Sequence, residues 1–312
     1  MDLLQNTPRF EAQAAAQIAA QHFGIHATAH PLPSERDQNF LLTINTDEKF
    51  VLKIANALEL REFLEAQNAV LNHVATRTGS CQSLVHALNG NEIVTVEGYF
   101  VRVVRYLPGV PLGEIRPHPA ELLCDLGRKL GQLDHALQDF DHPAVHRDFH
   151  WDLSKGNQII DEYAPLIENA NLREVVSRCR VNFEPRLRRS VIHGDANDYN
   201  VLVDPERMTV SGLLDFGDMV YSYTVADLAI AIAYVVLDTA HPRAAANEVI
   251  KGYTSEFALL DEELEAVWPL ALLRLAVSAC MAAYQQRQQP NNEYLRISQR
   301  AIEQNLPRIC TE

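Results

Sequence analysis

The pattern that decides the fold lies at residues 191–204: Val191-Ile192-His193-Gly194-Asp195-Ala196-Asn197-Asp198-Tyr199-Asn200-Val201-Leu202-Val203-Asp204. An apolar pair leads into His-Gly-Asp, and Asn200 follows Asp195 by five positions before a second apolar run. This order predicts a polar loop that leads into a strand. Taken alone, it could equally be a polar turn beside a hairpin.

A second polar stretch, Leu213-Leu214-Asp215-Phe216-Gly217-Asp218, follows after two strand-like pieces at 200–203 and 210–215. The turn Asp204-Pro205-Glu206 separates those pieces. In this order a loop carboxylate can hold an attacking hydroxyl, while an amide and a second carboxylate hold Mg²⁺ against nucleotide phosphates. The pair of motifs therefore predicts phosphoryl transfer.

Lys53 is one of only five lysines, and it stands in the apolar run Phe50-Val51-Leu52-Lys53-Ile54. Burying its charge costs free energy unless an anion meets it. A nucleotide phosphate and a helix glutamate would serve, with Glu65 as the expected partner and Glu62 as the fallback. On its own this lysine could instead extend to water at a strand edge, and the two later motifs favour the phosphate.

The first hundred residues predict an antiparallel sheet with one helix packed on it. Thr7 as N-cap, Pro8 as first helical residue and Gly24 just past the end bracket an Ala-rich helix before the sheet. We expect strands at 25–32, 39–45, 49–55, 83–87 and 99–107 and a helix at 58–75. Asn45, Thr46 and Asp47 are typical hairpin-turn residues.

The run Leu107-Pro108-Gly109-Val110-Pro111 breaks this pattern and predicts a domain boundary, with lobes at 1–107 and 108–312. The second lobe is expected to be mainly helical. Its leucine stripe predicts a core helix face and comprises Leu122, Leu126, Leu130, Leu133 and Leu137. Pro269 and Arg274 interrupt the apolar stretch at 267–284, which therefore predicts a kinked core helix or a helix pair and not a membrane span.

The composition narrows the class of partner. The chain has 27 Lys+Arg and 41 Asp+Glu, so its formal charge is 27 − 41 = −14, which argues against nucleic acid or an anionic membrane. The cysteines form no CxxC and predict reduced thiols in a cytoplasmic protein; they are Cys81, Cys124, Cys179, Cys280 and Cys310. Residues 1–7 lack the apolar core of a secretory signal.

The candidate residues as a set resemble the aminoglycoside phosphotransferase and choline kinase-like superfamily, which acts on small molecules. In sequence order they are Lys53, Glu65, the hinge residues Tyr106 and Leu107, His193-Gly194-Asp195, Asn200 and Asp215. The resemblance covers about residues 10–300. It implies an α+β, bilobal, protein-kinase-like fold, with a small antiparallel-sheet lobe for the nucleotide and a larger helical lobe for catalysis and substrate.

The resemblance also implies roles for single residues. Asp195 would orient or deprotonate a substrate hydroxyl, Asn200 and Asp215 would bind Mg²⁺, and Lys53 would hold the α- and β-phosphates of ATP or GTP. Asp227 matches the family's Asp-Leu-Ala segment, which implies a structural role. The implied partner is a small hydroxyl- and amine-bearing molecule, and the oligomeric state is not readable from the sequence.

Within the superfamily, residues 32–40, 193–200 and 151–153 are most similar to the hydroxylysine kinase branch. The first hairpin has no glycine, unlike the Gly-rich loop of protein kinases, so the segment 34–39 is expected to cover the phosphates. Its backbone N–H groups would act together with the side chains of Ser34, Gln38 and Asn39. The candidate substrate contacts are Trp151, Asp152, Asp198 and Asp218, whose chemistry suits a cationic amine.

Two other function classes are open at this point. A nucleotide-binding pseudokinase would share the fold, although every catalytic position carries a competent side chain. A metal-dependent hydrolase would use the alternation His146, Asp148, His150 and Asp152, which would share one face of a strand. The flanking residues indicate a loop instead. Within the kinase hypothesis, an aminoglycoside, choline or homoserine is the alternative substrate.

The triplet His146-Arg147-Asp148 spells the catalytic triplet of protein kinases. The residue five positions after Asp148 is Leu153, which has no magnesium ligand, and no Asp-Phe-Gly follows at hairpin distance. We therefore interpret the triplet as coincidental.

Overall fold

The computed structural model of the chain describes residues 6–34, 36–182, 186–237, 239–288 and 299–311. The chain divides into two compact units, Met1–Pro108 and Gly109–Glu312. The sequence predicted this boundary one residue earlier, between 107 and 108.

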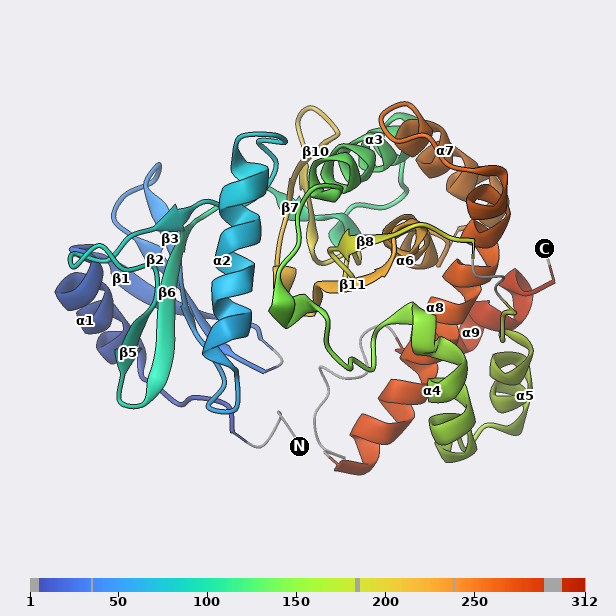
Figure 1. Cartoon of the computed structure of the whole chain (residues 1–312), viewed down its shortest axis with the longest axis horizontal. Helices are drawn as coiled ribbons and strands as arrows, with labels where there is room; N and C mark the ends of the chain where they lie inside the picture. The colour runs from blue at the N-terminus through green and yellow to red at the C-terminus, as the bar shows by residue number, and fades with distance from the viewer. Residues whose placement is uncertain (1–5, 35, 183–185, 238, 289–298, 312) are drawn as a thin grey trace. The chain divides into compact units, whose positions relative to one another are not determined.

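The first unit is an antiparallel sheet with helix α1 (Ala12–Phe23) on one face and α2 (Arg61–Ala75) on the other (Figure 1). The strand order is β1-β2-β3-β6-β4, and β5 also pairs with β6. The strands are β1 (Thr28–Leu32), β2 (Gln38–Thr43), β3 (Lys49–Ile54), β4 (Leu84–Val85), β5 (Val94–Val96) and β6 (Tyr99–Arg105). The predicted sheet and the helix at 58–75 are confirmed, while the short strand β5 was missed.

Strand alternation separates the core of this unit from its polar face. Phe50, Leu52 and Ile54 of β3 point into a hydrophobic core shared with α1. Lys53 lies between them in sequence and therefore points to the opposite face, where α2 packs. The sequence period thus places one lysine on the α2 side of the sheet.

Helix α1 begins later than the sequence predicted. Its N-cap is Glu11 and not Thr7, because the side chain of Gln38 binds both main-chain groups of Phe10 and holds that residue outside the helix. The predicted end at Gly24 is confirmed. Gly24 has φ +68°, and its N–H donates to the carbonyls of Ala19 and Ala20.

The second unit is built mainly from helices (Figure 1). They are α3 (Ala120–Leu137), α4 (Gly156–Tyr163), α5 (Ala170–Arg178), α6 (Val225–Val235), α7 (Pro242–Thr254), α8 (Asp261–Gln288) and α9 (Gln299–Ile309). Helix α3 crosses α7 at close range, since a Cβ on Gly127 would lie 1.9 Å from the carbonyl oxygen of Val249. The predicted leucine stripe of α3 is fully buried, so truncating any member should cost about 2–5 kcal/mol.

Helix α8 runs without a break through Pro269. Its length and composition would allow it to cross a membrane, but 72% of its most apolar window is buried inside the protein. Helices α6, α4 and α9 pack against it. The predicted kinked core helix or helix pair corresponds to this single unbroken element, which buries the charged side chains of Glu263 and Arg274.

Short strands in the second unit frame two loops. They are β7 (Val110–Pro111), β8 (Arg189–Ile192), β9 (Val201–Asp204), β10 (Thr209–Leu213) and β11 (Val220–Tyr223). The predicted hairpin is formed by β9 and β10, and Asp204 Oδ1 closes its turn by accepting the N–H groups of Glu206 and Arg207. The sequence missed β8 and β11, which pair with each other.

The cysteines are free thiols, as predicted. Cys179 and Cys310 are the two that meet, with their sulfur atoms 3.5 Å apart at the contact of α5 with the end of α9.

Candidate active site

Two antiparallel strand pairs bring the two predicted motifs together. Ile192 of β8 pairs with Val220 of β11, and Val201 of β9 pairs with Leu213 of β10. The loop at 193–200 and the loop at 214–219 each connect these same two pairs, so they lie against each other. The Leu214 N–H donates to the Asn200 carbonyl at 2.8 Å, and His193 Nε2 lies 2.9 Å from the Leu214 carbonyl oxygen.

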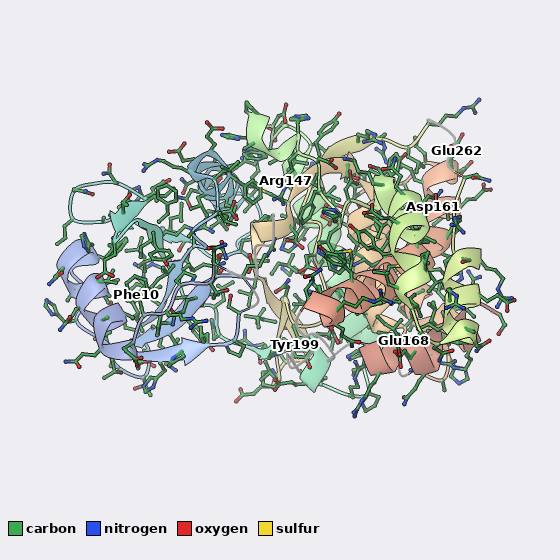
Figure 2. The ribbon with its side chains drawn as sticks, turned by 90° about the horizontal axis from the view of Figure 1, so that it is seen from below. Phe10, Arg147, Asp161, Glu168, Tyr199 and Glu262 are labelled. Carbon is green, nitrogen blue, oxygen red and sulfur yellow. The ribbon has the colours of Figure 1, made fainter. Side chains whose placement is uncertain are left out.

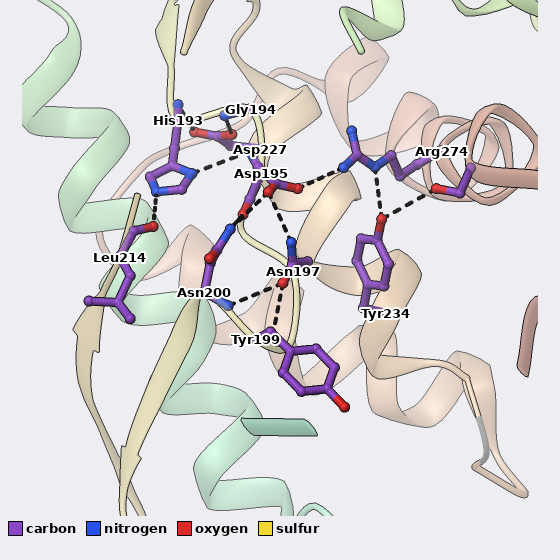
Figure 3. Close-up of polar contacts among 11 residues, drawn as sticks. His193, Gly194, Asp195, Asn197, Tyr199, Asn200, Leu214, Asp227, Tyr234 and Arg274 are labelled. Atoms are coloured by element: carbon purple, nitrogen blue, oxygen red, sulfur yellow. Dashed lines mark hydrogen bonds and ion pairs between the residues drawn. The ribbon is translucent and has the colours of Figure 1, made fainter. Parts of the chain in front are cut away.

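The loop at 193–200 is anchored by Asp227 on α6. Its carboxylate accepts the backbone N–H groups of His193 and Gly194, each at 2.7 Å (Figure 3). Gly194 has φ +79°, and a Cβ there would lie 2.6 Å from the carbonyl oxygen of Asp218. Only glycine satisfies both conditions without displacing the neighbouring loop.

The Asp195 carboxylate is held at both oxygens (Figure 3). Oδ2 accepts hydrogen bonds from the side-chain amides of Asn197 at 3.0 Å and Asn200 at 2.8 Å, while Oδ1 accepts one from Arg274 Nη2 at 2.7 Å. Each carboxylate oxygen can accept about two such bonds. Oδ2 is therefore filled, and Oδ1 keeps one acceptor position for a ligand.

Burial raises the pKa of the Asp195 carboxyl to about 7. The nearby carboxylates of Asp218 and Asp215 raise this pKa further, while Arg274 and the hydrogen bond from Asn197 lower it. About 20% of the Asp195 side chain stays exposed, which leaves a route for a hydroxyl. A carboxylate with a pKa near neutrality suits the acceptance of a proton at ordinary pH.

Arg274 enters the site from the middle of α8 and is only 2% exposed. Its Nε donates to the Tyr234 hydroxyl at 3.2 Å, and the Trp151 ring lies over the guanidinium at 4.6 Å. The Tyr234 hydroxyl lies 3.3 Å from Ser278 Oγ. These partners offset the cost of burying the guanidinium beside a carboxylate.

Asp215 begins the second loop in an unusual conformation, with φ +64°. Its Oδ1 accepts the Gly217 N–H at 3.0 Å, and Arg147 fixes the rest of the loop by donating to the carbonyls of Gly217 (2.9 Å) and Met219 (3.1 Å). A non-glycine residue at positive φ costs on the order of 1–3 kcal/mol. The loop thus holds Asp215 in a strained, fixed position. Arg147 is labelled in Figure 2.

Lys53 in the first unit is 9% exposed and shares its sheet face with its direct cross-strand neighbours, Asn39 of β2 and Arg102 of β6. Arg102 also donates to the side-chain oxygens of Asn68 at 3.0 Å and of Gln67. Two cationic side chains on adjacent strands favour an anionic ligand on this face.

A model of the phosphotransferase enzyme family matches residues 28–267. The chain belongs to this family. As a member it is an enzyme that transfers a phosphoryl group to a small molecule, which confirms the predicted superfamily and reaction class.

Relatives of this phosphotransferase agree with the predicted branch. Hydroxylysine kinase from Mus musculus is 33% identical over 92% of this chain and 86% of the relative's length. Hydroxylysine kinase from Xenopus laevis is 31% identical over 95% of this chain and 88% of the relative's length. The solved structure of amicoumacin kinase hAmiN, in complex with AMP-PNP, Ca²⁺ and Ami, superposes with a TM-score of 0.70 at 13% identity over 95% of this chain and 93% of that one. This likeness confirms the predicted protein-kinase-like fold.

The structure pairs Glu65 of the phosphotransferase differently from the prediction. Its carboxylate accepts Arg61 Nε at 2.8 Å, and both side chains are about half exposed. This i,i+4 pair lies on the outer side of α2, because the residues that point to the sheet are Leu64, Gln67 and Asn68. Glu65 is therefore not the partner of Lys53, and Glu62, the fallback, is also exposed.

The predicted phosphate contact at Gln38 is wrong. Gln38 lies on the same face of β2 as Phe40, toward α1, and both ends of its amide bind the main chain of Phe10, at 2.7 and 2.9 Å. Asn39 points the other way, beside Lys53, and its buried Oδ1 has no hydrogen-bond partner within the described part of the chain. Ser34 is half-buried and stays a prediction.

The predicted hinge follows directly after β6. The Tyr106 N–H donates to the Lys49 carbonyl at 3.2 Å, and Lys49 Nζ lies 5.7 Å from the centre of the Tyr106 ring. Leu107 is half-buried. A nucleotide contact at Tyr106 and Leu107 stays a prediction.

Asp152 is the predicted substrate contact that the structure contradicts. It is buried, and its carboxylate accepts the Ser154 N–H at 2.9 Å, the Ser154 hydroxyl at 2.7 Å and the Ser222 hydroxyl. These bonds tie the turn at 153–155 to β11. Asp152 therefore has a structural role in holding this turn against β11.

The other predicted substrate contacts lie close to Asp195 in sequence or in space. Trp151 stacks on Arg274, and the buried Asp218 raises the pKa of Asp195. Asp198 is also buried, with Arg116 Nη2 3.5 Å from its Oδ2, and its carbonyl accepts the Gly113 N–H. Trp151 and Asp218 thus remain candidates at the site, while Asp198 mainly fixes the segment after β7.

The alternation at 146–152 does not converge on a metal. His146 Nε2 lies 2.7 Å from Asp141 Oδ1, Asp148 pairs with Lys155, and the ring of His150 packs against Tyr163. Among the described residues, no three His, Cys, Asp or Glu side chains form a group that could hold a metal ion. The hydrolase hypothesis therefore loses its structural basis.

Sequence reasoning missed the two arginines that organise the site. Arg274 was noted only as an interruption of an apolar run, although a charge inside a core helix needs a buried partner. Arg147 belongs to the triplet that we interpreted as coincidental, and it proves to hold the Asp215 loop. Asn197 lay within the decisive stretch, but its contact with Asp195 depends on the loop conformation.

Proposed function

We propose that this phosphotransferase transfers the γ-phosphoryl group of ATP or GTP, with Mg²⁺, to a hydroxyl of a small amine-bearing molecule, with a hydroxylysine-like amino acid favoured. The observation that carries the proposal is the bond between Asp195 and Asn200, with Asp215 close enough to raise the pKa of Asp195. A hydroxyl acceptor and two candidate metal ligands thereby come from adjoining loops.

Asp195 receives the substrate hydroxyl in this mechanism. The hydroxyl donates to the remaining acceptor position on Oδ1, and its oxygen attacks the γ-phosphorus. The new O–P bond forms as the bond from the γ-phosphorus to the β,γ-bridging oxygen breaks, and a nucleoside diphosphate leaves. The hydroxyl proton passes to the Asp195 carboxylate, which Arg274, Asn197 and Asn200 hold in place.

The atoms of Asn200 and Asp215 fit a magnesium site. Asn200 uses its amide nitrogen on Asp195, so its side-chain oxygen is the atom left to face a cation, and Asp215 supplies a carboxylate. Mg²⁺ prefers such oxygen ligands. When bound, the ion would neutralise charge on the nucleotide phosphates.

Lys53 is proposed to hold the α- and β-phosphates from the sheet of the first unit. Its place beside Arg102 on the same sheet face supports this role, because two neighbouring cationic side chains attract a phosphate. Asn39 and Ser34 are the side chains proposed to cover the phosphates. Tyr106 and Leu107 are proposed to contact the nucleotide base.

The proposed substrate rests on the relatives and on charge. Four curated relatives named hydroxylysine kinase match 92–99% of the chain at 29–33% identity. The net charge of −14 also favours a cationic amine over an anionic metabolite. Preferred turnover of an aminoglycoside, choline or homoserine would change the proposed substrate but not the proposed reaction.

A coupled assay of nucleotide consumption tests the proposal, with 5-hydroxylysine, homoserine, choline and an aminoglycoside, each with ATP and with GTP. We expect turnover with 5-hydroxylysine at least 10-fold above the other three, and none without Mg²⁺. Phosphorylation of none of them, with nucleotide still bound, would instead favour the pseudokinase. The variant Asp148→Asn is the control and should keep wild-type turnover, because this carboxylate is 93% exposed and pairs with Lys155.

A further inference from the structure

One edge of the Arg274 guanidinium is hydrogen-bonded within the protein, and the other edge carries a nitrogen with no partner among the described residues. The Nε and Nη2 atoms, which form the side edge, donate to Tyr234 and to Asp195. Nη1 is buried and has no hydrogen-bond partner in the described part of the chain. Figure 3 shows this third nitrogen directed away from both partners.

Leaving Nη1 unpaired is costly. A buried charged donor without an acceptor loses its hydration and gains nothing in return, and nearly all such groups in native proteins are satisfied. The nearest polar side chain along α8 is Ser278, one turn on, and its Oγ lies 3.3 Å from the Tyr234 hydroxyl. Since no acceptor in the described part of the chain reaches Nη1, a ligand could supply one.

The unpartnered edge has a defined chemistry. Nη1 and the second N–H of Nη2 form two parallel donors, which match the two oxygens of a carboxylate. An ammonium or a sugar hydroxyl does not offer two parallel acceptors. The edge therefore selects a planar anion.

The position of this edge relative to Asp195 connects it to the reaction. The acceptor position that remains on Asp195 is on Oδ1, the same oxygen that Nη2 binds at 2.7 Å. A substrate hydroxyl on Oδ1 thus lies beside the guanidinium, and a carboxylate joined to that hydroxyl by a short carbon chain can reach Nη1. Choline and aminoglycosides carry no carboxylate.

We propose that Arg274 binds the carboxylate of the substrate through Nη1 and Nη2, and so selects a hydroxy amino acid over amino alcohols and aminoglycosides. This inference rests on the proposed function, because it assumes that Asp195 receives the substrate hydroxyl. Nη1 is buried, so binding requires a local side-chain shift, and Trp151 is the half-buried neighbour on the guanidinium face.

The test compares 5-hydroxylysine with its carboxamide, which keeps the hydroxyl and both amines and removes only the charge. For the wild type we expect kcat/KM to be about 10- to 100-fold lower for the amide, as the loss of charge-assisted hydrogen bonds implies. In Arg274→Gln the two substrates should differ by less than about 3-fold. The loss of the Asp195 contact affects both substrates equally and cancels in this ratio. Arg180→Gln, which removes an exposed ion pair with Asp161, is the control and should keep the wild-type ratio.

A wild-type ratio near 1 would overturn the inference without any variant, and so would a full wild-type ratio in Arg274→Gln. If Arg274→Gln does not fold, Arg274→Lys keeps the charge without the paired donors, and its ratio should fall below that of the wild type. An unchanged ratio there contradicts the inference. Failure of the proposed function has a different signature, because then the wild type phosphorylates neither substrate.

Discussion

Asn200 donates two hydrogen bonds from one amide nitrogen to Asp195, at 2.8 Å to the carboxylate Oδ2 and at 2.9 Å to the main-chain carbonyl. The candidate metal ligand and the candidate base are therefore held as one unit. Any change at Asn200 should alter both the metal site and the position of the base.

Substitution of Asn200 tests this coupling. Asn200→Ala removes both bonds and the candidate ligand oxygen, so kcat should fall by about 10²- to 10³-fold and the Mg²⁺ concentration for half-maximal rate should rise. Asn200→Asp keeps the oxygen but places a carboxylate against Asp195, and it should recover the Mg²⁺ response better than kcat. Rates measured over a Mg²⁺ titration check both. Equal Mg²⁺ dependence in all three proteins would contradict the assignment.

Arg147 should be needed for activity because it positions the Asp215 loop. Arg147→Gln loses the bonds to the carbonyls of Gly217 and Met219, and we expect a fall in kcat of at least about 10-fold. The control Arg180→Gln removes an exposed ion pair between Arg180, just after α5, and Asp161 of α4, and it should retain wild-type activity. The expectation fails if both variants keep full activity while thermal melting shows both folded.

Gly194 can be tested against a matched glycine. Gly194→Ala places a Cβ 2.6 Å from the Asp218 carbonyl at φ +79°, whereas Gly90→Ala has nearly the same φ, +83°, and nothing within 4 Å. Both should lose roughly 1–2 kcal/mol from the positive φ. Only Gly194→Ala should also displace the loop. Its free energy of unfolding in urea should therefore fall more than that of Gly90→Ala, and its kcat should be at least about 100-fold lower than that of the wild type. Equal losses would show that the contact with Asp218 carries no strain.

The fold was predictable where a local signal decided each element. The strands at 28–54 are strand-like runs separated by turn residues, the leucine stripe of α3 has helical spacing, and Gly24 ends α1 as predicted. The start of α1 was not predictable, because the side chain of Gln38, 28 positions after Phe10, competes with the local capping signals. Strands β8 and β11 have four residues each, and they pair with each other across the loops at 193–200 and 214–219.

The same difference between local and long-range signals applies to the residues of the candidate site. Asp195, Asn200 and Asp215 were predicted as site residues because local spacing places them on two polar loops, and the structure brings these loops together. Arg274 is 79 positions from Asp195 and Arg147 is 70 positions from Gly217, so no local pattern joins them. Glu65 was assigned from a helical position alone, and the face that α2 turns to the sheet shows why that assignment is wrong.

The free energy of unfolding should depend on pH through the buried carboxyl group of Asp134. Burial raises its pKa well above the usual value, the nearby Asp227 carboxylate adds to this, and its Oδ2 accepts the Tyr253 hydroxyl. A raised carboxyl pKa means that the folded state binds the proton more tightly. The stabilisation from that proton is therefore complete below the unfolded pKa near 4, and it is lost as pH rises toward the folded pKa.

Asp134→Asn should remove this dependence, since the amide can donate to Asp227 and accept from Tyr253 without titrating. The free energy of unfolding of the variant minus that of the wild type should increase with pH, by up to about 1.4 kcal/mol per unit. Urea unfolding at pH 5, 7 and 9 measures this difference. A difference that stays constant across that range would show that Asp134 is ionised in the folded protein.

The central claim is that Asp195 receives the substrate hydroxyl, and Asp195→Asn measures it most directly. This change keeps the size of the side chain and removes its capacity to accept the proton. Turnover of 5-hydroxylysine and binding of a non-hydrolysable nucleotide analogue are to be measured on the same preparation. We predict that kcat falls by about 10²- to 10⁴-fold while the Kd of the analogue changes less than about 3-fold. Turnover within 10-fold of the wild type would contradict the account.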